Sequence, residues 1–221
     1  MSSFDLKVVL DFLSDLALDN ERAWFAEHKA DYEKARLIFE RFVDELILRL
    51  SAFQDGIAGL AARDCVMRIY RDLRFSRDKT PYNTWMTCVI APGGRKSGRF
   101  GYGLRLKPCD TVAGGGLWEP KSEQIAAFRR AVERDPQTTL ALTRSPEFRR
   151  TFGGLIGEKL AKAPQGYASS HPAIEILKLK TVHVVRSFPD EAVCADDFAD
   201  SLIGTFRVMK PFLDYLNHAV C

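Results

Sequence analysis

The hydrophobic residues of this 221-residue chain change their spacing twice, and this change limits the fold more than any other feature. Apolar side chains recur at helical spacing over residues 5–18 and 31–52, and again over 196–218. Between these regions, short apolar runs with strand-like alternation occupy residues 65–115. Strands placed between two helical regions are typical of α+β proteins, whereas doubly wound nucleotide-binding folds alternate strand and helix. We therefore predict an α+β fold.

The predicted sheet has about five strands, most of them in a meander in the middle of the chain. The predicted strands are residues 65–70, 85–91, 101–107, 111–115 and 181–188. Short polar links join the first four strands, which favours antiparallel pairing. The N-terminal and C-terminal helices are expected to pack on this sheet. Further helices are predicted to begin after Asn20 and at Ser122, with these two residues as N-caps, and to lie over 137–143, 146–152 and 172–178.

Composition indicates an ordinary globular protein. Hydrophobic residues make up 46% of the chain and charged residues 28%, which excludes disorder, collagen and coiled coil as the main class. No repeat, linker or low-complexity tract divides the sequence, so we expect one domain over residues 1–221. No apolar run approaches the ~18 residues of a membrane-spanning helix, and the first residues lack the pattern of a secretory leader.

The cysteines and histidines give no sign of a metal or a disulfide framework. The five cysteines are an odd number at wide spacings, without a C-x-x-C motif. Cys65 and Cys88 lie in apolar runs, which predicts buried free thiols and a cytoplasmic location. The histidines lack ligand spacing, and the chain has no Walker loop, dinucleotide fingerprint or G-x-S-x-G elbow. We therefore expect no metal and no cofactor, and the sequence leaves open whether the protein is an enzyme.

Positive charge is concentrated in one segment. The whole chain is only +3, but residues 63–107 carry eleven Lys or Arg against three acids, a local charge of +8. The other residues have 21 basic against 26 acidic side chains, a charge of −5. Such an uneven distribution favours an anionic ligand, although a solvated basic face would have the same composition.

The densest part of this basic segment is Arg68–Tyr82, where aromatic residues alternate with charges. Asp72 and Asp78 cannot pair all of the basic groups here, and guanidinium forks suit phosphate or carboxylate. The predicted anion ligands are Arg68, Arg71, Arg74 and Lys79, and Tyr82 is predicted to line the ligand pocket. The aromatic residues between these charges are Tyr70, Phe75 and Tyr82. A structural salt-bridge network and a solvated loop are the two alternatives.

A run of three glycines, Gly114–Gly116, precedes Trp118. Glycine allows the backbone to approach either a ligand or a neighbouring strand closely, and the second explanation is the more common one. Trp118 is a candidate for the wall of a ligand pocket, with a core anchor at a strand end as the alternative.

Several blocks of the sequence resemble a widespread bacterial family, with some fungal members, that is catalogued as a conserved-hypothetical domain of unknown function. The blocks are Asn20–Phe25 with Tyr32, Arg68–Tyr82, Gly114–Pro120, Phe152–Leu155 with Gly157–Leu160, and His171–Glu175 with Leu177–Lys180. The match spans residues 4–218. The resemblance implies a single α+β domain in a cytoplasmic protein and brings no activity, substrate or catalytic residue. Lys178, in the last block, is added as a ligand residue.

The chain also departs from the pattern of that family. Asn83, Thr84 and Trp85 stand where a Lys-Thr-His run is frequent, and Lys107 and Cys109 replace an acid and a glycine. If that histidine serves catalysis in other members, this chain lacks it.

Three functions follow from these observations. The preferred hypothesis is a site for a small anionic ligand, with a phosphorylated one favoured. The second is a protein-interaction or scaffold domain whose arginines form structural ion pairs. The third is nucleic-acid binding by the basic sheet face, in which the hairpin at Gly93–Arg99 contacts phosphates. No membrane partner is expected, and the sequence leaves the oligomeric state open.

Overall fold

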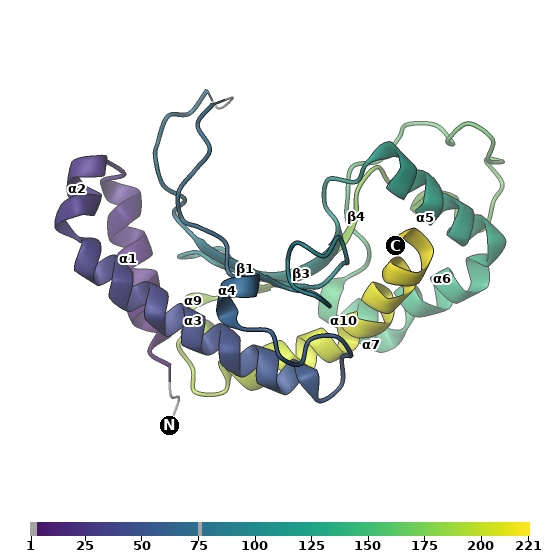
Figure 1. Cartoon of the computed structure of the whole chain (residues 1–221). Coiled ribbons are helices and arrows are strands. Elements are labelled where there is room, and N and C mark those ends of the chain that lie inside the picture. The colour runs from purple at the N-terminus through teal and green to yellow at the C-terminus, as the bar shows by residue number, and fades with distance from the viewer. Residues whose placement is uncertain (1–3, 75–76) are drawn as a thin grey trace. The chain divides into compact units, whose positions relative to one another are not determined.

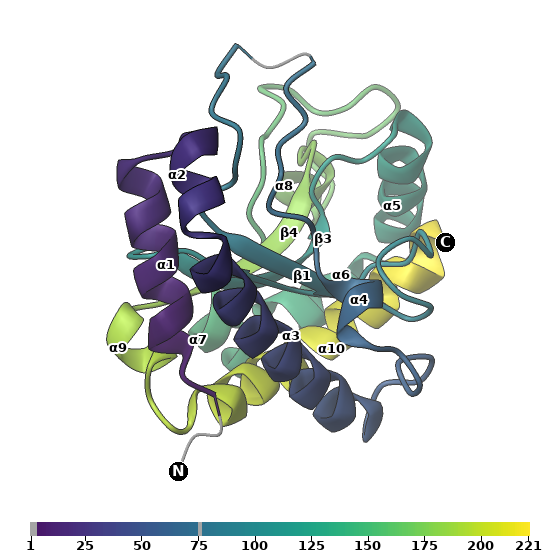
Figure 2. The same cartoon turned by 60° about the vertical axis from the view of Figure 1, so that its left-hand side comes forward.

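Three helices form the N-terminal part of the chain, which a computed structural model describes at residues 4–74 and 77–221. They are α1 (Leu6–Leu18), α2 (Arg22–Glu27) and α3 (Lys29–Ser51). α1 runs beside α3 (Figures 1 and 2), and the buried faces of both helices follow the apolar spacing of the sequence. The two predicted helical regions at the N-terminus are therefore confirmed.

The predicted N-cap at Asn20 is wrong. Glu21 occupies the N-cap position of α2, without a side-chain hydrogen bond. The Asn20 side chain instead bonds both backbone groups of Tyr82: its Nδ2 donates to the carbonyl at 3.0 Å, and its Oδ1 accepts from the amide at 3.1 Å. A residue chosen as a local cap thus joins two segments 62 positions apart in the sequence.

Four strands form one antiparallel sheet in the order β1-β2-β3-β4 within the described residues. They are β1 (Met86–Ile90), β2 (Tyr102–Leu106), β3 (Thr111–Leu117) and β4 (Val182–Phe188). The α+β class and four of the five predicted strands are confirmed. The strand predicted over residues 65–70 does not form.

In place of that strand, the chain forms a short helix and two isolated bridges. The helix is α4 (Ala62–Cys65), and the bridges pair Val66 with Cys88 and Tyr70 with Tyr82. The segment between them contacts β1 only locally, through the Met67 amide and the Thr87 carbonyl at 2.8 Å. The apolar run at 65–70 therefore borders the sheet without becoming a full strand.

The remaining helices follow the sheet strands β1–β3. They are α5 (Ser122–Arg134), α6 (Pro136–Arg144), α7 (Pro146–Phe152), α8 (Ile174–Leu177), α9 (Asp190–Val193) and α10 (Phe198–Val220). The predicted cap Ser122 lies inside α5, because Lys121 takes the N-cap position and its amide donates to Gln124. The sequence did not predict α9.

The glycine triplet serves strand packing. A Cβ on Gly116, whose φ is +134°, would lie 2.3 Å from the Val182 carbonyl oxygen of β4. A Cβ on Gly114 would lie 2.6 Å from the Val184 carbonyl oxygen. Both distances exclude a side chain, so the close approach that the sequence predicted here is to a neighbouring strand.

The described chain forms two compact units. Unit 1 comprises the residues up to Ser97 together with Gly103–Ala113 and Ser187–Ile203, and unit 2 comprises Gly98–Tyr102, Gly114–Arg186 and Gly204–Cys221. In unit 1, α1 and α3 enclose a core that includes Phe39, Phe42 and Leu46. In unit 2, Phe128, Val184 and Phe206 are among the buried residues. The expectation of one domain over residues 1–221 stays a prediction.

Among the helices formed by residues 4–74 and 77–221, none combines the length and the apolar character that crossing a bilayer requires.

Candidate functional site

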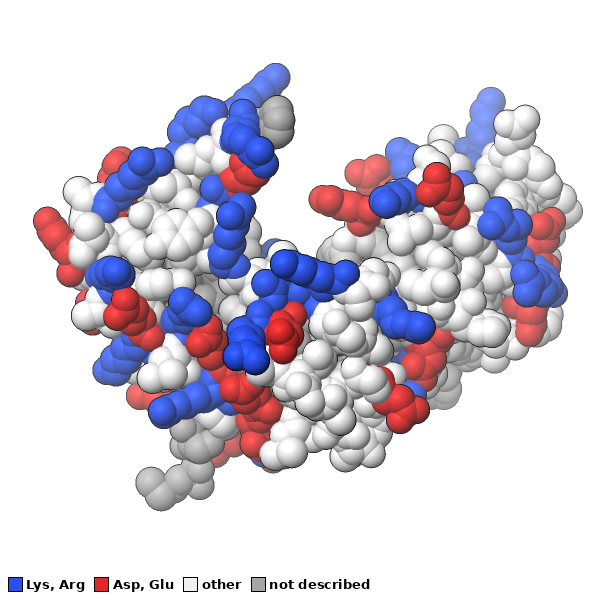
Figure 3. Space-filling view, viewed as in Figure 1, with Lys and Arg blue, Asp and Glu red and all other residues white. Residues whose placement is uncertain are grey.

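The Arg68–Tyr82 segment forms a loop closed by backbone hydrogen bonds. At its base, Tyr70 bridges Tyr82, the Arg71 amide donates to the Pro81 carbonyl at 3.0 Å, and the Asn83 amide donates to the Ile69 carbonyl at 2.8 Å. Residues 71–74 and 77–81 lie at the upper left in Figure 1. Figure 3 shows Lys and Arg side chains gathered over these residues, with acidic side chains beside them.

Three of the four predicted anion ligands bond groups of this loop. Arg71 Nη1 lies 2.6 Å from Asp78 Oδ2 and also contacts the carbonyl and hydroxyl of Thr80. Arg74 Nη2 lies 2.7 Å from Asp72 Oδ2. Because these acids lie close in sequence, the loop supplies its own counterions.

Lys79 is also engaged inside the loop, since its Nζ donates to the Leu73 carbonyl at 3.0 Å. A binding role for Arg71, Arg74 and Lys79 stays a prediction. Phe75, predicted as an aromatic neighbour of these charges, lies outside the described residues.

The loop carboxylates are held in their charged form. The Thr80 amide, followed by Arg71 and the Thr80 hydroxyl, lowers the pKa of Asp78 to about 2. The hydrogen bonds from Arg74 lower the pKa of Asp72. Both acids are therefore anionic at neutral pH.

The predicted ligand residue Tyr82 is a packing residue in the structure. It is only 7% exposed and stacks on Phe25, with the ring centroids 3.9 Å apart and the planes at 12°. The Tyr70 ring lies against the Tyr82 ring, with the two centroids 5.4 Å apart. Together with the Asn20 bonds, this cluster attaches the base of the loop to α2.

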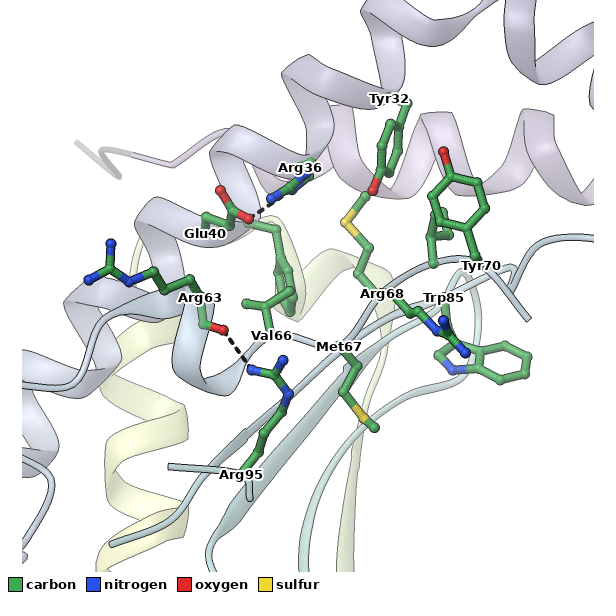
Figure 4. A pocket seen from close by; sticks show the side chains of 13 residues that line it. Tyr32, Arg36, Glu40, Arg63, Val66, Met67, Arg68, Tyr70, Trp85 and Arg95 are labelled. Carbon is green, nitrogen blue, oxygen red and sulfur yellow. Dashed lines mark hydrogen bonds and ion pairs between the residues drawn. The ribbon is translucent and has the colours of Figure 1, made fainter. Parts of the chain in front are cut away.

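Arg68, the fourth predicted anion ligand, lines a pocket of about 250 Å³ in unit 1 (Figure 4). The pocket lies between α3, α4, the residues that follow α4, and the start of β1. Its lining residues are Tyr32, Arg36, Phe39, Glu40, Arg63, Val66, Met67, Arg68, Ile69, Tyr70, Trp85, Met86 and Arg95. The structure thus brings one predicted anion ligand, Arg68, together with three arginines that were not among the predicted anion ligands.

The charges of this pocket are only partly balanced. Arg36 Nε donates to Glu40 Oε1 at 2.8 Å, and Glu40 is the single acid among the lining residues. Arg95 Nη1 donates to the Arg63 carbonyl at 2.6 Å, as the dashed line in Figure 4 shows. Four guanidinium groups against one carboxylate leave an excess of three positive charges.

The Arg68 guanidinium forms no ion pair or hydrogen bond with any residue in the described part of the chain. Its charge acts on Asp72 only as a weaker influence than the direct bonds from Arg74. Arg68 is exposed, so its donors are accessible from solvent. A planar fork with free donors is suited to an anionic ligand.

Aromatic rings form part of the pocket wall. Tyr32, Tyr70 and Trp85 belong to three segments that are distant in the sequence. Burial raises the pKa of the Tyr32 hydroxyl, while the charge of Arg36 acts in the opposite direction. Tyr32 is therefore a neutral hydrogen-bonding group at physiological pH.

The last two predicted ligand residues belong to unit 2. Trp118 is 49% exposed and stacks on His183, with centroids 3.9 Å apart. Lys178 Nζ lies 3.1 Å from Glu175 Oε1. Each therefore has a partner within its own unit, and a binding role for either stays a prediction.

Sequence reasoning missed Arg36 and Glu40 as pocket residues. Their four-residue spacing places them on one side of α3, but the sequence offered no sign that this side meets the segment after α4. Arg63 and Arg95 lie within the basic segment that the sequence identified, and their separation of 32 positions hid their contact.

Comparison with models of known protein families gives a match. A family model described as "Conserved hypothetical protein (DUF2461)" matches residues 8–215. That description names no activity. No curated protein and no solved structure matches the chain.

Proposed function

We propose, from the premise that this chain belongs to the conserved hypothetical protein family DUF2461, that unit 1 binds a small anionic ligand. The preferred ligand is a phosphorylated molecule with one flat ring. The observation that carries this proposal is the Arg68 guanidinium, which lines the pocket and has no ion pair or hydrogen bond among the described residues. An anion would satisfy its donors and offset the excess positive charge of the lining.

The pocket wall favours the flat ring. Tyr32, Tyr70 and Trp85 line the pocket, and aromatic side chains stack on planar groups at about 1–3 kcal/mol per base in nucleic-acid sites. The volume of about 250 Å³ lies just below the ~300–1,000 Å³ of typical small-molecule sites. The ligand is therefore a small one, such as a ring with a single phosphate group.

The cytoplasm is the proposed location. Cys65 and Cys88 are buried free thiols, and burial raises the pKa of both, that of Cys65 to about 11. Thiols of this kind act as small apolar core residues and suit a reducing compartment.

The test is a thermal-shift titration at low salt with phenyl phosphate, inorganic phosphate, adenosine monophosphate and a short single-stranded oligonucleotide. A bound probe at about 100 times its Kd adds about 2.7 kcal/mol, which raises Tm by several degrees. Loss of a hydrogen bond to a charged group costs about 1.5–3 kcal/mol, so Arg68→Gln should weaken phenyl phosphate binding at least tenfold.

The matched control is Lys96→Gln, which removes one charge from an exposed residue beside Arg95 that is outside the pocket lining. This variant should bind phenyl phosphate like the unaltered protein. Equal weakening by Arg68→Gln and Lys96→Gln would contradict a localised site and indicate a general effect of charge. Binding of the oligonucleotide alone, with a steep salt dependence, would instead favour nucleic acid.

A protein-interaction domain is the second candidate, and the loop favours it. Arg71 and Arg74 are paired with acids of the loop, so these two charges have counterions without a ligand. Met67 and Tyr70 are 52% and 49% exposed nearby and offer apolar area to a partner. Absence of a thermal shift from every probe, with normal stability of Arg68→Gln, would favour this candidate.

A further inference from the structure

Unit 2 holds its own pocket, which none of the predicted ligand residues lines. Its volume is about 280 Å³, and it lies among the ends of α6 and α7, the residues after α7, and α8 with its flanks. The lining residues are Leu140, Thr143, Arg144, Arg149, Gly153, Gly154, Leu155, Lys159, Pro172, Ala173, Ile174, Glu175, Ile176 and Leu179.

Two arginines of this pocket have no acidic partner among the described residues. Arg144, the last residue of α6, forms no ion pair or side-chain hydrogen bond there. Among the described residues, the Arg149 side chain on α7 donates only to the Gly153 carbonyl, at 3.3 Å from Nη1. Both side chains are exposed, so their remaining donors are accessible.

The single acid of the lining is already matched by lysines. Glu175 Oε2 lies 3.0 Å from Lys159 Nζ, and its Oε1 lies 3.1 Å from Lys178 Nζ. These two bonds hold the pKa of Glu175 below its usual value, which keeps it charged and occupied. Glu175 is therefore not available to neutralise Arg144 or Arg149.

The other side chains of the lining are mainly aliphatic. Leu140, Ala173 and Leu179 are buried and form an apolar base, and Leu155 and Ile176 are half-buried. The lining contains no aromatic residue, so it has no platform on which a flat ring would stack. Binding of an aliphatic chain here would be favoured, because it removes apolar surface of the chain and of the pocket from water.

The end of α7 leaves room for a ligand. Gly153 ends the helix with a φ of +72°, and a Cβ at Gly153 or Gly154 would meet nothing within 4 Å. The volume of about 280 Å³ lies just below the ~300–1,000 Å³ of typical small-molecule sites, which limits the ligand to a short chain.

We propose that this pocket binds a short aliphatic carboxylate, with the carboxylate on Arg144 and Arg149 and the chain on the aliphatic base. The planar fork of a guanidinium fits the planar carboxylate with two parallel hydrogen bonds. The proposal concerns unit 2 alone and uses no residue of the unit 1 pocket.

The probe is hexanoate, titrated into the full chain by calorimetry. Acetate keeps the carboxylate without the chain, and hexanol keeps the chain without the charge, so both should bind at least tenfold more weakly than hexanoate. Arg144→Gln and Arg149→Gln should each weaken hexanoate binding about tenfold or more, because each removes a hydrogen bond to a charged group.

The matched control is Arg150→Gln, which removes the same charge from the neighbouring exposed position of α7, outside the lining. It should bind hexanoate like the unaltered protein. Thermal unfolding without ligand shows whether each variant is folded, and Arg149→Lys, which keeps the charge but loses the fork, should bind more weakly than the unaltered protein.

Four results would overturn the proposal. The first is no heat and no thermal shift with hexanoate at millimolar concentration. The second is equal weakening by Arg150→Gln and Arg149→Gln. The third is binding of hexanol as tight as that of hexanoate, which would assign the pocket to neutral ligands. The fourth is binding of acetate as tight as that of hexanoate, which would show that the aliphatic base contributes nothing.

Discussion

The two pockets are close in volume, about 250 and 280 Å³, and arginines line both, yet their walls differ. The wall in unit 1 includes two tyrosines and a tryptophan, whereas the wall in unit 2 is aliphatic. A guanidinium attracts phosphate and carboxylate alike, so the charge alone would not separate their ligands. The apolar part of each wall therefore sets which anion fits.

The arginines also differ in whether an acidic side chain pairs with them. In the 71–81 loop, Arg74 finds Asp72 two positions away and Arg71 finds Asp78 seven positions away. Arg68 and Arg144 have no such acid partner among the described residues. Asp64 and Asp72 each lie four positions from Arg68, and Glu147 lies three positions from Arg144. Nearness in the sequence therefore does not decide by itself which arginine is paired, and the local backbone geometry selects the pairs.

Replacement of the two predicted aromatic ligand residues should have the largest effect on the free energy of unfolding. The size of this effect should differ between Tyr82 in unit 1 and Trp118 in unit 2. Tyr82→Ala should lower the free energy of unfolding by about 3–5 kcal/mol, because the ring is 7% exposed and stacked on Phe25. Trp118→Ala should cost about 1–2 kcal/mol, since half of the ring is exposed and its one stacked partner is His183. Denaturant unfolding of both variants gives the comparison.

Tyr82→Phe is the control for the first variant, because it keeps the stacked ring and should unfold near the unaltered midpoint. A smaller loss for Tyr82→Ala than for Trp118→Ala would show that Tyr82 is not a packing anchor. It would then return to consideration as a ligand residue.

The sequence predicted the elements with strong periodicity and missed those that depend on distant contacts. The stripes of α1 and α3 and the alternation of β1 to β4 were sufficient because each is local. The run at residues 65–70 has the composition of a strand, but only two isolated bridges form there. Asparagine is a frequent N-cap residue, but the Asn20 side chain forms hydrogen bonds with the backbone of Tyr82 instead of capping α2.

The candidate site was predictable only in part for the same reason. The density of charge in Arg68–Tyr82 is visible in the sequence, while the pairing of Arg71 and Arg74 is a matter of loop geometry. The pocket of Arg68 needs Arg36 from α3 and Arg95 from a distant hairpin, and spacing along the chain carries no information on that meeting. Counting charges along the sequence identifies the basic segment, but only the three-dimensional contacts show which of its arginines line the pocket.

The pH dependence of stability should differ between the units, with a moderate effect in unit 2. Burial lowers the pKa of His183 below its ordinary value of 6.5, so the unfolded chain binds a proton there more readily than the folded one. Its contribution to stability is therefore present above pH ~6.5 and lost as the pH falls towards the folded value. His183→Gln should remove this dependence, as measured by denaturant unfolding between pH 5 and 8.

His218→Gln is the matched control for the substitution itself, because it replaces an exposed histidine of α10 with the same residue. If the stability of His183→Gln changed with pH as that of the unaltered protein does, the assignment of this pH dependence to His183 would be contradicted. The loss should also be smaller than that of Tyr82→Ala, because His183 is only half-buried and solvent screens its charge.

The smallest effect is expected in the loop of unit 1, at a much lower pH. Asp78 should titrate at about 2 by NMR, and any stability it supplies is present above its ordinary value near 3.8 and lost as the pH falls through about 2. Arg71→Gln should raise this pKa only part of the way towards 3.8, because the Thr80 amide, the larger cause, still donates to the carboxylate. A full return to 3.8 would mean that Arg71 alone holds the carboxylate. The loop would then depend on one ion pair, and an external anion would have to displace the Asp78 carboxylate to reach Arg71.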